Sequence, residues 1–208
     1  LTAMFLILGC VSYNANANNR IMAFFRPQPD PHPWSIMGYV GKTAKQKLAH
    51  LIRCNYTSAH ETLISAELAR TFYKTWWLKL QLAGNIATRI ADKNVYPEAS
   101  PIAEGDIYIM LRIISFPWND YLYTTFAFGE GVSLANKSPF PGKKGVTAKN
   151  SKAFLNFLAF EFTFSLPSHP EWELVFRIHH RSAAKGTYAP QYYHAGSNNV
   201  GVGIRYCF

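Results

Sequence analysis

The sequence has no long apolar run. No stretch of about 18 or more consecutive apolar residues occurs in its 208 residues, so it contains no candidate for a membrane-spanning helix. It also has no internal repeat and no clustered motif of a nucleic-acid-binding protein. The length predicts one domain or one barrel, and nucleic acid is not expected as a partner.

Cysteine is scarce and poorly placed for a structural role. The three cysteines, Cys10, Cys54 and Cys207, cannot all pair within the chain, and their spacing matches no metal-binding motif. Neither a disulfide framework nor a metal site is therefore predicted, and no cofactor is expected.

The N-terminal region has the pattern of a secretory signal without its basic start. An apolar run at 1–11 is followed by Ala15-Asn16-Ala17, a small-x-small cleavage pattern. We expect a signal peptide over 1–17 and a mature chain that begins near Asn18. A lipoprotein signal with Cys10 as the lipidated residue is the alternative, although the residues before Cys10 match it poorly. Residues 18–33 are polar and rich in proline, which predicts an irregular lead-in.

From Trp34 onward, apolar and polar residues alternate. Hydrophobic residues make up 49% of the chain, yet the mean hydropathy is only −0.07. Alternation with period two is typical of strands that have two different faces, and it accounts for this combination. Eight strands are predicted, at about 34–41, 61–73, 75–90, 104–116, 120–133, 152–166, 171–183 and 197–208.

The connections between these segments alternate in length. The long ones are near 42–60, 91–103, 134–151 and 184–196, and the short ones are near 74, 117–119 and 167–170. Long loops on one side and tight turns on the other are typical of outer-membrane barrels. All five tryptophans fall at the short-turn ends, as expected of an aromatic girdle at a membrane interface. We therefore predict an all-β fold, an eight-stranded antiparallel transmembrane β-barrel over 34–208, located in the Gram-negative cell outer membrane.

A soluble β-sandwich or lipocalin-like barrel would also alternate. Its polar strand faces would meet water, however, and charged residues are only 16% of this chain, too few for eight solvated faces. The polar positions suit a narrow lumen filled by paired side chains, such as Glu161 with Arg177 on adjacent strands. Eight strands leave an interior that side chains fill, so no pore is expected.

The penultimate strand carries a polar end on its apolar face. His180 and Ser182 follow Trp172, Leu174, Phe176 and Ile178 on that face, whereas His179 and Arg181 point to the lumen. Residues two apart lie about 6.5–7 Å apart along a strand, and a Ser–His pair can form an activated nucleophile if a third group orients the imidazole. Counting back along the last strand places Asn198 beside them. Because polar groups that face lipid are costly, we predict a catalytic site of Ser182, His180 and Asn198 at the outer leaflet.

On the sequence His180-Arg181-Ser182 and the predicted barrel, the chain resembles the outer-membrane lipid A 3-O-deacylase family, acyloxyacyl hydrolase-like eight-stranded barrels. The resemblance covers mostly residues 120–208. It implies an esterase that removes an ester-linked 3-hydroxyacyl chain from lipid A, with a His-x-Ser pair that faces the membrane and a Glu near the start of the last strand. Two departures stand out. Ala183 takes the place of an Asn that often follows the Ser, and Asn198 occupies the Glu position.

Three further residues are candidates for binding the substrate. Glu130 lies on the apolar face near the extracellular end of its strand, but two strands from His180, a gap of about 10 Å. Arg181 and Lys185 belong to a group of basic residues at the long-loop side that we expect to hold lipid A phosphates. The net charge of +9 favours anionic lipid headgroups and lipopolysaccharide.

Two other classes of function stay open on the sequence. The chain could be a non-enzymatic outer-membrane barrel that serves as an anchor, an adhesin or a structural protein, with the basic loops as its working part. It could also be another lipid-modifying barrel, such as a phospholipase or an acyltransferase.

Overall fold

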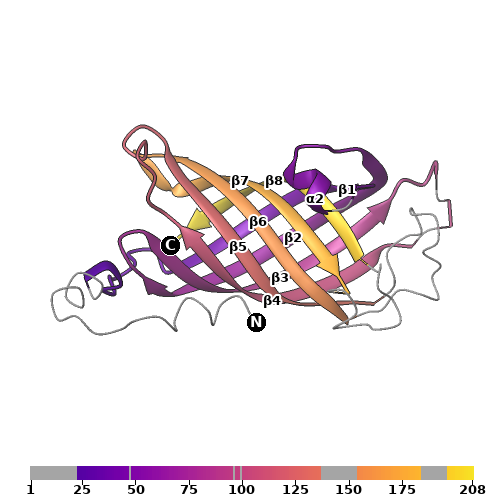
Figure 1. Ribbon diagram of the computed structural model, residues 1–208. Helices are drawn as coiled ribbons and strands as arrows, with labels where there is room; N and C mark the ends of the chain where they lie inside the picture. The colour runs from indigo at the N-terminus through magenta and orange to yellow at the C-terminus, as the bar shows by residue number, and fades with distance from the viewer. Residues whose placement is uncertain (1–22, 47, 96, 99, 137–153, 184–195) are drawn as a thin grey trace.

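The computed structural model describes residues 23–46, 48–95, 97–98, 100–136, 154–183 and 196–208 (Figure 1). Each strand pairs antiparallel with the next, and the first pairs with the last, so the sheet closes into a barrel. The predicted fold class is thereby confirmed, while the predicted signal peptide at 1–17 lies outside the described residues. The elements are β1 (Trp34–Ala44), α2 (Leu48–Ile52), β2 (Ser58–Lys74), β3 (Leu78–Ala91), β4 (Ile102–Ile113), β5 (Tyr123–Ala135), β6 (Phe154–Leu166), β7 (His169–Ser182) and β8 (Gly196–Cys207).

The strand boundaries agree with the predicted ones to within a few residues. β2 begins at Ser58, so His60, at the end of the connection predicted near 42–60, belongs to a strand. β3 begins at Leu78 because Thr75 forms the turn before it. The Thr75 hydroxyl accepts hydrogen bonds from the backbone N–H groups of Trp77 (3.3 Å) and Leu78 (3.1 Å).

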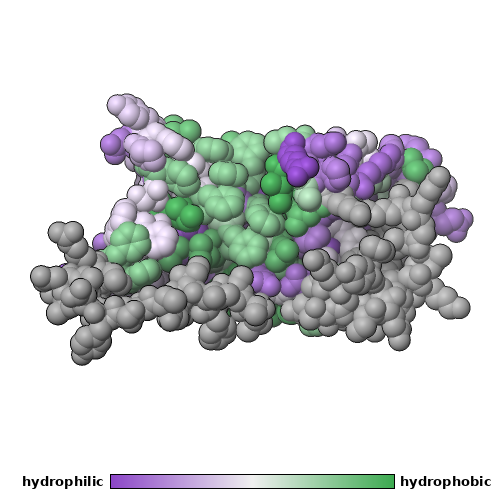
Figure 2. All heavy atoms as spheres, in the orientation of Figure 1, coloured by the Kyte–Doolittle hydropathy of each residue, from purple (hydrophilic) through white to green (hydrophobic). Residues whose placement is uncertain are grey.

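The outer surface of the barrel is apolar across its middle. Along β1, Ile36 and Val40 are about half exposed, whereas Met37 and Tyr39 are buried in the lumen. Figure 2 shows hydrophobic residues gathered over the centre of the visible face and hydrophilic residues toward the long-loop end near α2. Exposed tryptophans mark the short-turn end, at Trp34, Trp76, Trp118 and Trp172. A band of this kind with an aromatic girdle is what an outer-membrane barrel presents to lipid.

The lumen is filled by charged side chains that pair with one another. Among the described residues, six carboxylates, five guanidiniums and His179 are buried. Glu161 lies at the centre: it accepts a hydrogen bond from Arg177 Nε (3.0 Å) and pairs with Arg112 (3.1 Å) and Arg205 (2.8 Å). The predicted Glu161–Arg177 pair across β6 and β7 is confirmed. Such pairing offsets much of the cost of removing these charges from water.

The lead-in before β1 is attached to the short-turn end of the barrel. Gln28 N–H donates to the Lys74 carbonyl (2.8 Å), and the Asp30 carboxylate pairs with Lys74 (3.3 Å) and Lys79 (3.0 Å). Burial alone would raise the pKa of Asp30, but the two lysines outweigh it and hold this pKa below its usual value.

The helical content is small. Within the described part of the chain, no helix is long and apolar enough to cross a membrane.

Candidate functional site

The outward face of β7 changes from apolar to polar toward the long-loop end. Trp172, Leu174 and Phe176 are exposed on the outside of the barrel, and His180 and Ser182 continue the same face half-buried. The intervening His179 and Arg181 are buried in the lumen. The predicted orientation of the His–Ser pair, toward the membrane side of the wall, is thus confirmed.

His180 and Asn198 lie directly opposite each other on β7 and β8. A hydrogen bond joins His180 Nδ1 to Asn198 Oδ1. The Asn198 amide is turned this way because its Nδ2 donates to the Gln46 carbonyl (2.6 Å), so its oxygen is left to face the imidazole. An amide oxygen only accepts, which assigns the proton to His180 Nδ1 and leaves Nε2 as the basic nitrogen.

Ser182 lies one pair further along the same face. Its cross-strand neighbours are Gly196 on β8 and Asn156 on β6. Because His180 and Ser182 are separated by one lumen-facing residue, their Cα atoms are about 7 Å apart along the strand. Both side chains emerge on one side of the sheet, within the reach that a nucleophile and its base need if they lean together.

Asn156 is a member of this polar group that the sequence reasoning missed. It is 4% exposed although it lies on the outward face of β6, and its Nδ2 donates to the Gly131 carbonyl (3.2 Å). Alternation could have found it, since Asn156 is the polar exception between Phe154 and Leu158 on the apolar face.

The connection between β1 and β2 covers the outer side of Asn198, which is only 3% exposed. This connection contains α2, which ends at Ile52 and is followed by a left-handed Cys54 (φ 58°) whose N–H donates to the Leu51 carbonyl (2.9 Å). In Figure 1 it lies beside the long-loop end of β8. Gln46, which touches Asn198, was not a candidate from the sequence, because a contact made by a backbone carbonyl carries no residue-type signal.

Glu130 lies in the same cross-strand row as His180, with Leu158 of β6 between them. Its side chain is exposed on the outside of β5. Two strand spacings separate it from the histidine, about 10 Å, as the sequence predicted. The carboxylate is therefore too far from the imidazole to orient it directly.

The other two predicted substrate-binding residues are Arg181 and Lys185. Arg181 is fully buried in the lumen, 3.4 Å from Glu104. Its prediction as a ligand of lipid A phosphates is wrong, because strand alternation turns its charge inward. Lys185 lies outside the described residues.

A second polar cluster lies in the lumen behind the site. Ligand-type atoms of Glu104, Asp106 and His179 come within 4.8 Å of one another. His179 Nε2 lies 2.6 Å from Glu104, which is also bound by Arg89 Nε (2.7 Å). Two guanidiniums, those of Arg89 and Arg181, face this cluster and oppose a metal cation, so we interpret it as part of the lumen ion network.

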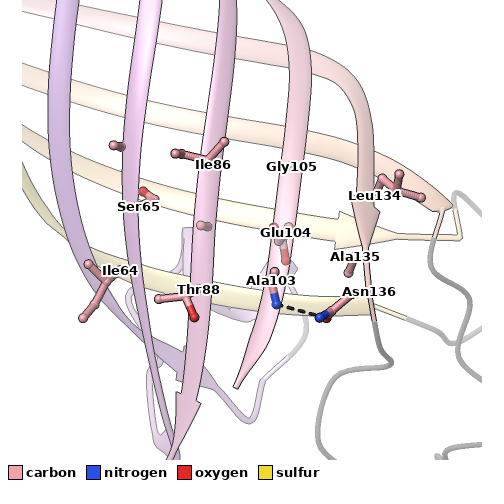
Figure 3. Close-up of a pocket in the computed structure, with 12 residues that line it drawn as sticks. Ile64, Ser65, Ile86, Thr88, Ala103, Glu104, Gly105, Leu134, Ala135 and Asn136 are labelled. Atoms are coloured by element: carbon pink, nitrogen blue, oxygen red, sulfur yellow. Dashed lines mark hydrogen bonds between the residues drawn. The ribbon is translucent and has the colours of Figure 1, made fainter. Parts of the chain in front are cut away.

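A shallow apolar groove runs along the outside of β2–β5, on the opposite side of the barrel (Figure 3). Its volume is about 750 Å³, and Ile64, Ile86 and Leu134 form its exposed walls. The carboxylate that lines it, Glu104, is buried and engaged in the lumen. None of the predicted catalytic residues lines this groove.

The comparisons with known proteins support the fold. No family model matches the sequence, and no curated protein sequence matches it. The structure is similar to that of the outer membrane enzyme PagL, with a TM-score of 0.58 and 11% identity over 83% of this chain and 98% of that chain. The Yersinia pestis outer membrane protein Ail gives a TM-score of 0.46 and 10% identity, over 85% and 99% of the two chains. The chain thus has the fold of an eight-stranded outer-membrane barrel.

Proposed function

We propose that this protein is an outer-membrane esterase that removes an ester-linked 3-hydroxyacyl chain from lipid A. The observation that carries the proposal is the His180–Asn198 hydrogen bond on the membrane-facing side of the wall, next to Ser182. A water-soluble substrate would not meet this surface, whereas a lipid of the outer leaflet would. The His-x-Ser resemblance and the likeness in fold to an outer membrane enzyme agree with it.

In the proposed mechanism, Ser182 Oγ attacks the carbonyl carbon of the ester while His180 Nε2 takes its proton. His180 then gives this proton to the departing sugar oxygen, and the acyl group is held on Ser182. His180 Nε2 next takes a proton from water as the water oxygen attacks the acyl carbon, and it gives this proton to Ser182 Oγ as the acyl–serine bond breaks. The products are a free 3-hydroxy fatty acid and a lipid A molecule with one free hydroxyl.

Asn198 holds the imidazole in the tautomer that this mechanism needs. It cannot stabilise the imidazolium by charge, as a carboxylate does, so we expect slower turnover than an enzyme with Glu at this position. A donor for the oxyanion is required near Ser182. The backbone N–H of Ala183 and the second N–H of the Asn156 amide are the candidates among the described residues.

The substrate's headgroup would lie across the outward row from Asn198 to Glu130. Lys42 faces outward on β1, where its Nζ donates to the Thr62 hydroxyl (2.7 Å). It lies two residues along β1 from Ala44, which pairs with Asn198. We expect Lys42 to contact a lipid A phosphate and Glu130 to contact a hydroxyl or amide of the headgroup.

The decisive test is mass spectrometry of lipid A from outer membranes that carry either the wild-type protein or Ser182→Ala. Loss of one 3-hydroxyacyl chain with the wild type alone is expected, because the variant lacks the nucleophile and should be slower by at least about 10³-fold. Lipid A that is unchanged with both proteins would overturn the deacylase. Release of phospholipid acyl chains would indicate a phospholipase, and activity in neither assay would favour a non-enzymatic barrel.

A further inference from the structure

Gln46 lies outside the predicted triad, yet its backbone carbonyl contacts the triad's third member. Asn198 Nδ2 donates to the Gln46 carbonyl (2.6 Å), and Asn198 Oδ1 accepts from His180. The two residues are 152 positions apart in the chain. Two hydrogen bonds therefore connect Gln46, in the β1–β2 connection, through Asn198 to the imidazole of His180.

An asparagine needs such a contact where a glutamate would not. A carboxylate presents an acceptor to the imidazole in either orientation. The amide of Asn198 presents an acceptor in one orientation and a donor in the other. A turned amide would select the tautomer with the proton on His180 Nε2, which cannot take a proton from Ser182.

The position of the Gln46 carbonyl is itself fixed by its own side chain. Gln46 Nε2 donates to the Thr57 hydroxyl (2.7 Å), and Thr57 N–H donates to Gln46 Oε1 (2.8 Å). Lys45 N–H bonds to the Thr57 carbonyl (2.9 Å). These three hydrogen bonds close the base of the connection and hold residue 46 against the outer side of β8.

We propose that Gln46 is a positioning residue for the deacylase site: its carbonyl fixes the amide of Asn198, and thereby the tautomer of His180. The inference rests on the proposed function for its consequence in catalysis. Its structural part, the tautomer, can be measured without turnover. It also explains how the chain can use an asparagine where the family has an acid.

The kinetic test is a double-mutant cycle of Gln46→Ala and Asn198→Asp, with lipid A hydrolysis by purified barrel in detergent as the readout. In the otherwise wild-type barrel, Gln46→Ala should lower kcat about tenfold with little change in KM, within the range for residues of one hydrogen-bond network. In the barrel that already carries Asn198→Asp it should cost less than about twofold, because a carboxylate needs no orienting partner. Thr57→Val should act in the same direction as Gln46→Ala, but less strongly.

Asn55→Ala is the matched control, since Asn55 is exposed on the same connection, and it should stay within about twofold of wild type. Equal losses from Gln46→Ala with and without Asn198→Asp would overturn the inference and leave the esterase intact.

The second readout is the ¹⁵N spectrum of histidine-labelled barrel, with His180 assigned by comparison with His180→Gln. Wild type should show the Nδ1-protonated form, and Gln46→Ala should populate the other tautomer. If Gln46→Ala leaves the His180 tautomer unchanged, the inference is overturned whether or not the protein hydrolyses lipid A. If Ser182→Ala retains activity, only the proposed function is overturned.

Discussion

The two sides of the barrel wall treat polar residues differently. Inside, buried acids and arginines are paired several times over, and Glu161 alone meets three guanidiniums. Outside, a hydrogen bond joins His180 to Asn198, and another joins Asn198 to the Gln46 carbonyl. The inner set replaces water throughout the lumen. The outer set lies where the outward face of β7 changes from apolar to polar, toward the long-loop end.

This difference separates structural from functional polarity. A barrel of eight strands must fill its lumen with side chains, so polar residues there need no explanation beyond packing and charge balance. No such need exists on the lipid side, where each polar group carries a cost. A histidine, a serine and two asparagines gathered there are the stronger indication of a site.

The largest effect expected from breaking the inner set is on stability. Glu161→Gln should lower the free energy of unfolding by about 3–5 kcal/mol, because it leaves three buried guanidiniums short of a partner. Urea unfolding in lipid vesicles measures it. Glu171→Gln, which removes an exposed pair with His169 (3.4 Å), is the control and should cost less than about 1 kcal/mol. Equal effects of the two variants would contradict the expectation that ion pairs in the lumen contribute more to stability than an ion pair on the surface.

An intermediate effect is expected from removing one cation on the outer side of the barrel wall and, separately, one on the lumen side. Lys42→Gln should raise KM for lipid A about fivefold, and less so at high salt, since it removes a screened contact with phosphate. Arg181→Gln should lower stability and leave KM within about twofold, because Arg181 is fully buried in the lumen. Initial-rate kinetics at two ionic strengths separate the two. A KM change for Arg181→Gln in a fully stable barrel would indicate that Arg181 contacts the substrate after all.

The smallest effect concerns Asp30 and pH. The two lysines hold the folded pKa of Asp30 below the unfolded value of about 3.9. The contribution of Asp30 to stability is therefore complete above the unfolded value, and it is lost as pH falls through the folded pKa. Hydrogen exchange of the Gln28 amide, corrected for its intrinsic rate, should be slow at pH 7 and faster near pH 3. Asp30→Asn should abolish this pH dependence, at a cost of about 1 kcal/mol. A wild-type amide that is equally protected at both pH values would contradict the assignment.

Most of the fold could be predicted from the sequence because apolar and polar residues alternate along each strand, and this alternation identifies its two faces. The same alternation put His180 and Ser182 outside and His179 inside, and it placed Glu130 at its correct distance. It also turns the Arg181 side chain into the lumen, which conflicts with the prediction of a phosphate ligand from its position near a loop. Asn156 stands out in the same pattern as a polar residue on the apolar face of its strand.

The sequence by itself determined the barrel and the face on which each strand residue lies, because these follow from period two and from loop lengths. Only the tertiary structure decided what holds Asn198. The contact with Gln46 joins residues far apart in sequence through a backbone carbonyl, which every residue type possesses. It depends on where the β1–β2 connection folds over β8, and no local pattern in the chain specifies that.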